Sequence, residues 1–269
     1  MRCATLYTRL LEVYGQQGWW PIVNNKTLLC EYGLGAPRNE AERFEIAIGA
    51  ILTQNTQWYP NTVRAIQQLK LGRPFKKEEL EVIKKAEIIR DDTFGNNKKQ
   101  TKSQLLTQNT AWTNVEKALI NLDKEKLIDS GKLLKISEKK LALLIKPAGY
   151  FNQKAKKLSL FANFYLGLKG KTPTRTSLLS VWGIGPETAD SILLYAYGVS
   201  EFVVDAYTRR ICLYYSFISE NATYDEVKSF FENGIKKDKT IYQEFHALLV
   251  EHAKRYYSKK PFGIQDPLV

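Results

Sequence analysis

Apolar residues recur at helical spacing along most of the chain, and this pattern predicts an all-α protein. The first predicted helix spans about 4–15, and a strongly apolar stretch at 40–52 predicts a second, buried helix. Helical periodicity runs through 111–145 until Pro147 and Gly149 stop it, and another helix opens after Gly149. Residues 206–255 carry three more helical patterns. We therefore expect helices packed on helices around a core that a chain of 269 residues can readily build.

A short motif occurs twice in the first half of the chain. Leu52-Thr-Gln-Asn-Thr56 is followed by Trp58, and the same five residues at 106–110 are followed by Trp112. Deleting residues 57–110 would join the helix of 40–52 directly to the helical pattern that starts at 111. We interpret 57–110 as an insertion or partial duplication with helical patterns near 60–70 and 76–90. Continuity with the upstream helix favours the first copy as the functional one, and continuity downstream favours the second.

Two adjacent tryptophans, Trp19 and Trp20, precede Pro21 between the first two predicted helices. Neighbouring side chains on a regular element point in different directions, so the two rings cannot both face the same way. The pair has two interpretations. One interpretation is that both rings close the gap between two packed lobes. The other is that one ring stacks on a base that has been flipped out of a duplex.

The charge balance favours a nucleic-acid partner. Lys and Arg number 40 against 28 Asp and Glu, which gives a net charge of +12. The three cysteines are scattered, so they predict a reducing compartment and no metal site. No apolar run approaches the roughly 20 residues that a membrane helix needs. We expect a soluble cytoplasmic protein, associated with the nucleoid and without membrane contact.

The stretch Val181-Trp-Gly-Ile-Gly-Pro-Glu-Thr-Ala189 predicts a tight turn between two helices. Glycine accepts positive φ in such a turn, and Pro186 suits the first position of the second helix. Backbone N–H groups at that helix start can hold a phosphate. Turns of this kind are common, so the turn alone is a weak indication of function. Asp205, which lies 18 residues after Glu187 and just before another predicted helix, makes the pattern more specific.

The turn and the aspartate together resemble the helix–hairpin–helix (HhH-GPD) DNA glycosylase superfamily, the endonuclease III-like proteins. This resemblance implies an all-α, two-lobed fold with the active-site cleft between the lobes. It assigns Asp205 as the catalytic carboxylate. It also assigns a set of DNA-contacting residues in the hairpin, in the polar turn after residue 52 and in the Gly149-Tyr-Phe-Asn-Gln-Lys-Ala155 stretch, namely Gly183, Ile184, Gly185, Thr188, Gln54, Asn55 and Lys154.

Two departures from the superfamily pattern change the expected chemistry. Members that also cut the DNA backbone carry a lysine at the position of Glu187, and a carboxyl group cannot form a Schiff base. Endonuclease III-like relatives follow a stretch similar to the one around His252 with four cysteines that hold an iron–sulfur cluster. Here the tail after His252 contains no cysteine, so we expect no cluster, no other cofactor and no metal.

These departures, with the Trp-Trp-Pro segment, look most like the type III 3-methyladenine DNA glycosylase branch. The resemblance implies a monofunctional glycosylase of base excision repair that acts as a monomer on double-stranded DNA containing a damaged base. An alkylated purine is cationic, so aromatic walls would attract it through cation–π contact. The predicted base pocket consists of Trp19, Trp20, Pro21, Trp58, Trp112 and Lys254.

Two other functions stay open on the sequence. Aromatic walls also suit uracil, thymine or an oxidised purine. A catalytically inactive hairpin protein that only binds DNA is the other alternative, because about 50 extra residues beside the site could block base entry. For the domains we expect a terminal helical lobe made of 1–40 and 200–269, and a six-helix lobe made of 41–199 that carries the hairpin and the insertion.

Overall fold

The computed structural model describes residues 2–25, 27, 29–33, 35, 37–54, 63–81 and 128–268 of the chain. These residues are mostly helical, as the hydrophobic pattern predicts. One short antiparallel hairpin pairs β1 (Ile22–Val23) with β2 (Cys30–Glu31). Within the described residues, no helix is both long and apolar enough to cross a bilayer.

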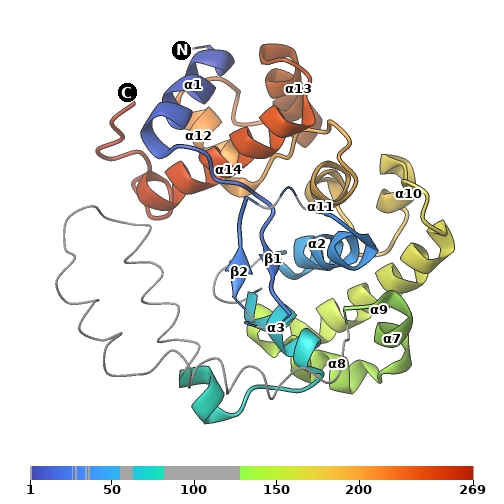
Figure 1. The fold of residues 1–269 in the computed structure, drawn as a ribbon. Helices are drawn as coiled ribbons and strands as arrows, with labels where there is room; N and C mark the ends of the chain where they lie inside the picture. The colour runs from blue at the N-terminus through green and yellow to red at the C-terminus, as the bar shows by residue number, and fades with distance from the viewer. Residues whose placement is uncertain are drawn as a thin grey trace.

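One group of helices lies at the end of the molecule where both chain termini are found (Figure 1). It contains α1 (Cys3–Tyr14), α12 (Ala206–Tyr214), α13 (Tyr224–Gly234) and α14 (Lys239–Tyr256). Helix α14 packs against α1 and α12, and α1 also contacts α13. Asp238 begins α14 by accepting hydrogen bonds from the backbone N–H groups of Thr240 and Ile241, which is the usual role of an N-cap carboxylate.

A second group is built around α2 (Glu40–Leu52), which contacts α3, α9, α11 and η3. Residues 44–52 of α2 are all buried, as the apolar run predicts. The other members are α3 (Val63–Leu71), α7 (Ser130–Lys135), α8 (Glu138–Leu144), the 3-10 turn η2 (Lys146–Ala148), α9 (Phe151–Leu168), α10 (Arg175–Leu179), α11 (Pro186–Ser191) and the π-helical turn η3 (Ile192–Ala196). The predicted boundaries near residues 40 and 200 stay a prediction.

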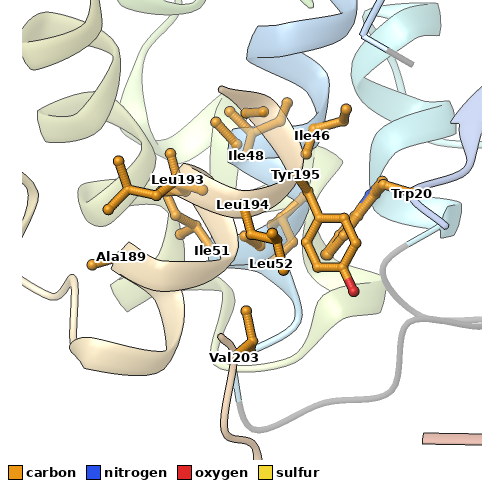
Figure 2. Close-up of a cluster of buried hydrophobic side chains, with 14 of the residues drawn as sticks. Trp20, Ile46, Ile48, Ile51, Leu52, Ala189, Leu193, Leu194, Tyr195 and Val203 are labelled. Atoms are coloured by element: carbon orange, nitrogen blue, oxygen red, sulfur yellow. The ribbon is translucent and has the colours of Figure 1, made fainter. Parts of the chain in front are cut away.

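The apolar side chains of α2 and η3 interlock in the middle of the molecule (Figure 2). Ile48 and Ile51 from α2 lie beside Leu193 and Leu194 from η3, and all four side chains are buried. Turn η3 also contacts α14 of the first group. The segment that follows the 181–189 turn is therefore anchored to both groups of helices.

Helix α3 lies within the predicted insertion of 57–110, near the helical pattern expected at 60–70. It packs against α2, α8 and η2, and Val63, Ile66 and Leu69 are buried. Lys70 pairs with Glu45 of α2 at 2.6 Å, with both side chains nearly excluded from solvent. Residues 63–71 are thus part of the core, held by an apolar face and a buried ion pair. The assignment of 57–110 as an insertion stays a prediction. The second copy of the repeated motif lies outside the described residues.

The tail after α14 is fixed by one buried carboxylate. Asp266 accepts hydrogen bonds through Oδ2 from Tyr215 at 2.8 Å and Tyr257 at 2.6 Å, and His252 Nε2 lies 3.0 Å from the same oxygen. Burial alone would raise the pKa of Asp266, but the bonds from His252 and Tyr257 outweigh it and hold the pKa at about 2. The residues here offer a carboxylate, phenols and an imidazole. They do not fit an iron–sulfur cluster, which needs thiolates.

Candidate active site

The 181–189 turn is a tight hairpin between α10 and α11. Ile184 donates its backbone N–H to Val181 at 3.0 Å, and Gly183 has a φ of +86°, where a side chain would be strained. A Cβ atom at Gly183 would also stand 2.7 Å from the side chain of Lys157, which comes from α9. The backbone conformation therefore favours glycine at 183, and a Cβ there would also force the side chain of Lys157 to shift.

Gln54, from the first copy of the repeated motif, ties the end of α2 to this hairpin. Its Nε2 group donates to the carbonyl oxygen of Gly183 and to Thr188 Oγ1, each at 2.9 Å. Its Oε1 atom accepts from Lys157 Nζ at 2.5 Å. The sequence predicts that Gln54 and Thr188 contact DNA. In this structure their polar groups bind each other and the protein around them, where they hold the hairpin in place. Their contact with DNA stays a prediction.

Asp205 begins α12 directly after the buried segment 202–204. Its Oδ1 atom accepts the backbone N–H of Thr208 at 2.7 Å, so the carboxylate is an N-cap with a fixed orientation. No residue in the described part of the chain donates a hydrogen bond to Oδ2. The side chain is partly exposed. One carboxylate oxygen thus holds the helix, and the other is available to a ligand.

Glu187 shares the electrostatic environment of Asp205. Its side chain, in the first turn of α11, reaches solvent, yet the protein around it removes part of the carboxylate's hydration. This desolvation, with the nearby charge of Asp205, raises the pKa of Glu187 to about 7. The position at which bifunctional members carry a lysine therefore holds a carboxyl group that is half-protonated near neutral pH.

Tyr195 and His246 bring the two groups of helices together near Asp205. The Tyr195 hydroxyl, from η3, lies 2.7 Å from His246 Nδ1 of α14 and 3.2 Å from the carbonyl oxygen of Gln243. Burial raises the pKa of Tyr195 and lowers that of His246, and the charge of Asp205 acts on both. We call Asp205, Glu187, Tyr195 and His246 the Asp205 cluster.

The two tryptophans take different positions. Trp20 is only 7% exposed and lies edge-on to the ring of Tyr195, with 5.1 Å between centroids (Figure 2). Pro21 is also buried. Trp19 is half-buried, stands edge-on to the His246 ring at 6.2 Å, and has Lys254 Nζ over its face at 5.8 Å from the ring centroid. Trp20 fills the core, and Trp19 is the ring that meets Lys254.

Lys154 requires a correction. We predicted that it contacts the phosphate backbone, but it is 2% exposed and its Nζ donates to the carbonyl oxygens of Leu52 at 2.8 Å and Ala148 at 2.7 Å. Burial, with a smaller contribution from the charge of Lys157, lowers the pKa of Lys154 to about 8. Its ammonium group joins the ends of α2 and η2 inside the protein and does not face a phosphate.

Three predicted residues, Asn55, Trp58 and Trp112, lie outside the described residues. Conversely, the structure adds Tyr195 and His246, which the sequence did not mark as functional. His246 carried one usable signal, since the chain has only two histidines. Tyr195 carried none, because it lies in an apolar helical run. Lys157 belongs, with Lys154 and Lys156, to a group of lysines at a helix start that suits a phosphate backbone, and in the structure its Nζ donates to Gln54 Oε1.

The comparisons with known proteins place the chain in a family. The model of the HhH-GPD superfamily base excision DNA repair proteins matches residues 103–237. A candidate DNA repair glycosylase of Methanocaldococcus jannaschii is 46% identical over 175 residues, covering 61% of this chain and 80% of the relative.

Solved structures match nearly the whole chain. The H. pylori 3-methyladenine DNA glycosylase MagIII, bound to 1,N6-ethenoadenine, is 25% identical, with a TM-score of 0.57 and coverage of 95% of this chain and 98% of that chain. A trapped covalent complex of endonuclease III with DNA is 14% identical, with a TM-score of 0.59 and coverage of 100% and 93%, which shows the shared fold. From the family match and these relatives, the chain belongs to the helix–hairpin–helix (HhH-GPD) superfamily of base excision repair proteins and is a DNA glycosylase of the endonuclease III-like type.

Proposed function

We propose that the protein is a monofunctional glycosylase that releases an alkylated purine, such as 3-methyladenine, from double-stranded DNA. The observation that carries this proposal is the pair of carboxyl groups, Asp205 and Glu187, at the positions where a bifunctional member would have a carboxylate and an amine. The similarity to a solved glycosylase named for 3-methyladenine supports the choice of base.

Asp205 supplies the chemistry. As the bond between the sugar C1′ and the base nitrogen breaks, its electron pair goes to the base and positive charge develops on the sugar. A carboxylate oxygen without another partner stabilises that charge without having to reorganise. Water then adds to C1′, and its proton passes to Asp205 and on to solvent. Because a cationic purine leaves as a neutral molecule, the reaction needs no strong acid at the base.

The surroundings of Trp19 favour a cationic base. The face of this ring already holds the ammonium group of Lys254, whose side chain is 50% exposed and makes only a loose 3.9 Å ion pair with Glu251. A positively charged purine could replace that ammonium over the ring through the same cation–π attraction. The negative charges of the Asp205 cluster add to this preference, since they attract a cation more than a neutral base.

Backbone cleavage is not expected, because it requires an amine that attacks C1′. Glu187 cannot do this, and the buried Lys154 ammonium is bound to two carbonyl oxygens.

The hairpin and the residues beside it are the proposed DNA-binding surface. Trp182 is 53% exposed on the hairpin, with Lys156 Nζ 4.8 Å from the centre of its ring, so an apolar surface and a cation lie together beside Gly183.

The deciding experiment is base release from duplex DNA treated with a methylating agent, with the freed bases separated by chromatography and the strands examined on a denaturing gel. We expect free 3-methyladenine and intact strands until alkali is added. Borohydride should trap no protein–DNA adduct with the natural protein. The Glu187→Lys variant, which restores the amine, serves as the comparison. Release of uracil, thymine or an oxidised purine in place of methylated purines would reject the proposed base, and strand cleavage would reject the monofunctional chemistry.

A further inference from the structure

His246 has one buried ring nitrogen that no described residue satisfies. The residue is 5% exposed, and its Nε2 atom has no hydrogen-bond partner in the described part of the chain. Leaving a buried polar atom unpaired costs about 1–3 kcal/mol, so such atoms are few in a native protein and each calls for a partner, such as a ligand or an ordered water. The other histidine, His252, shows the usual arrangement, since Tyr14 lies 2.8 Å from its Nδ1 and Asp266 3.0 Å from its Nε2.

The contact to Tyr195 decides which nitrogen of His246 carries the proton. The Tyr195 hydroxyl has one hydrogen to donate, and its two acceptors are His246 Nδ1 at 2.7 Å and the Gln243 carbonyl oxygen at 3.2 Å. The shorter contact is the stronger bond, and the Gln243 carbonyl lies within α14, where it can accept the helical N–H. If Tyr195 donates to Nδ1, the neutral ring must carry its hydrogen on Nε2. The unpaired atom is then a donor.

Two neighbours relate this donor to the proposed base pocket, the ring of Trp19 and the carboxylate of Asp205. The Nε2 edge of the ring points away from Tyr195, because Nδ1 is held by the hydroxyl. The half-buried face of Trp19 stands perpendicular to the His246 ring, with an interplanar angle of 87°. Asp205, the proposed catalytic carboxylate, is close enough for its charge to act on His246. An aromatic wall, a carboxylate and a buried N–H donor thus surround the same region.

The geometry points to His246 as a specificity-determining residue that donates a hydrogen bond from Nε2 to an acceptor atom, a ring nitrogen or a carbonyl oxygen, on the extruded base. Tyr195 is the positioning residue that sets its tautomer. The inference deepens the proposed function: the stacking ring selects a flat base, and the donor selects among flat bases by requiring an acceptor at one point. A site built in this way rejects a base that lacks the acceptor, because the donor is then left buried and unpaired.

The test is long-range proton–nitrogen NMR of the full-length protein, labelled at its two histidines and titrated with free 3-methyladenine, adenine and uracil. We expect His246 Nε2 to carry a proton in the free protein and to shift when a base binds, while both nitrogens of His252 stay unchanged as an internal control. His246→Phe keeps an aromatic ring but removes the donor, so it should weaken base binding about tenfold. Tyr195→Phe should change the tautomer of His246.

The outcomes separate the two proposals. An Nε2 without a proton, or one that responds to none of the three bases, overturns the role of His246 even if base release from methylated DNA is observed. An Nε2 that shifts with a base, in a protein that releases no base from DNA, keeps the binding site and rejects the proposed catalytic function. Equal base affinity for the natural protein and His246→Phe also overturns the inference. The fold of each variant is checked by the chemical-shift dispersion of its proton spectrum and by its thermal unfolding midpoint.

Discussion

Gln54, at the end of α2, donates a hydrogen bond at 2.9 Å to the backbone carbonyl of Gly183 in the hairpin. The same side chain accepts from Lys157 of α9 and donates to Thr188 of α11. Three helices and one turn therefore share a single amide. Because an amide offers two donors and an acceptor in one plane, its place sets the distance between the core helix α2 and the proposed phosphate-binding turn.

We predict that Gln54→Leu weakens both stability and DNA binding. The substitution removes the two hydrogen bonds that Nε2 donates and the acceptor of Lys157, and each lost partner of a partly buried group costs about 1 kcal/mol. Chemical unfolding should show a loss of about 1–3 kcal/mol. Affinity for undamaged duplex, measured at fixed salt, should fall with it. Gln153→Leu, at an exposed position on α9, is the matched control. Unchanged DNA affinity in Gln54→Leu would show that Gln54 does not position the hairpin for DNA binding.

We predict that Asp205→Asn abolishes base release and leaves the fold intact. Asparagine caps a helix about as well as aspartate, so the bond from Thr208 survives, while the negative charge that stabilises the sugar cation is lost. Single-turnover base release should fall by about a hundredfold or more, with thermal stability and duplex affinity close to those of the natural protein. Asp238→Asn, at the N-cap of α14, is the control and should retain activity. Comparable rates in both variants would overturn the assignment of Asp205.

Glu187 should make stability depend on pH near neutrality. Its pKa is raised from 4.5 to about 7 in the folded protein, by desolvation first and by Asp205 second, so the folded state holds a proton that the unfolded chain releases. Its contribution to stability is present below about pH 4.5 and is lost as the pH rises through 7. Comparing unfolding free energies at pH 5 and pH 8, the loss should be smaller in Glu187→Gln than in the natural protein.

A carboxyl-carbon NMR titration provides the direct check on Glu187. The midpoint should move down in Asp205→Asn, because the neighbouring negative charge is gone. A midpoint that stays the same in both proteins would show that the two carboxyl groups do not interact.

Asp266 should stabilise the protein above about pH 4. Its pKa is lowered from 3.8 to about 2, chiefly because hydrogen bonds from His252 and Tyr257 outweigh its burial. The stabilisation is therefore present above the unfolded value and is lost as the pH falls towards 2. The shift corresponds to about 2 kcal/mol, and replacing this buried carboxylate by an amide also removes one of the two oxygens that accept hydrogen bonds.

The measurement for Asp266 is urea unfolding of Asp266→Asn at pH 7. We expect a loss of about 2–4 kcal/mol. Asp225→Asn is the contrasting variant, since that side chain is 71% exposed in its ion pair with Arg175 and should change stability by less than about 1 kcal/mol. Equal losses in the two variants would mean that the tail is not held by Asp266.

Much of this molecule could be predicted from local patterns. The apolar run of 40–52 predicted the buried helix α2, and Gly183 and Pro186 predicted the turn and the start of α11. Such features depend on short-range rules, helical periodicity and backbone preference, which are written into neighbouring residues. The predicted phosphate contact of Lys154 was wrong because the sequence around a lysine at a helix start is the same whether its ammonium group points to solvent or to two carbonyl oxygens.

The sequence by itself determined that the chain is helical, basic and built around a hairpin with Asp205 at the superfamily spacing. Composition and spacing can be obtained from the order of the residues alone, without knowing which residues are in contact. Only the tertiary structure decided that Gln54 binds the hairpin, that Trp20 fills the core while Trp19 lies against Lys254, and that His246 lies near Asp205. Those relationships join residues distant along the chain. Their energies depend on burial and direction, which exist only once the helices have packed.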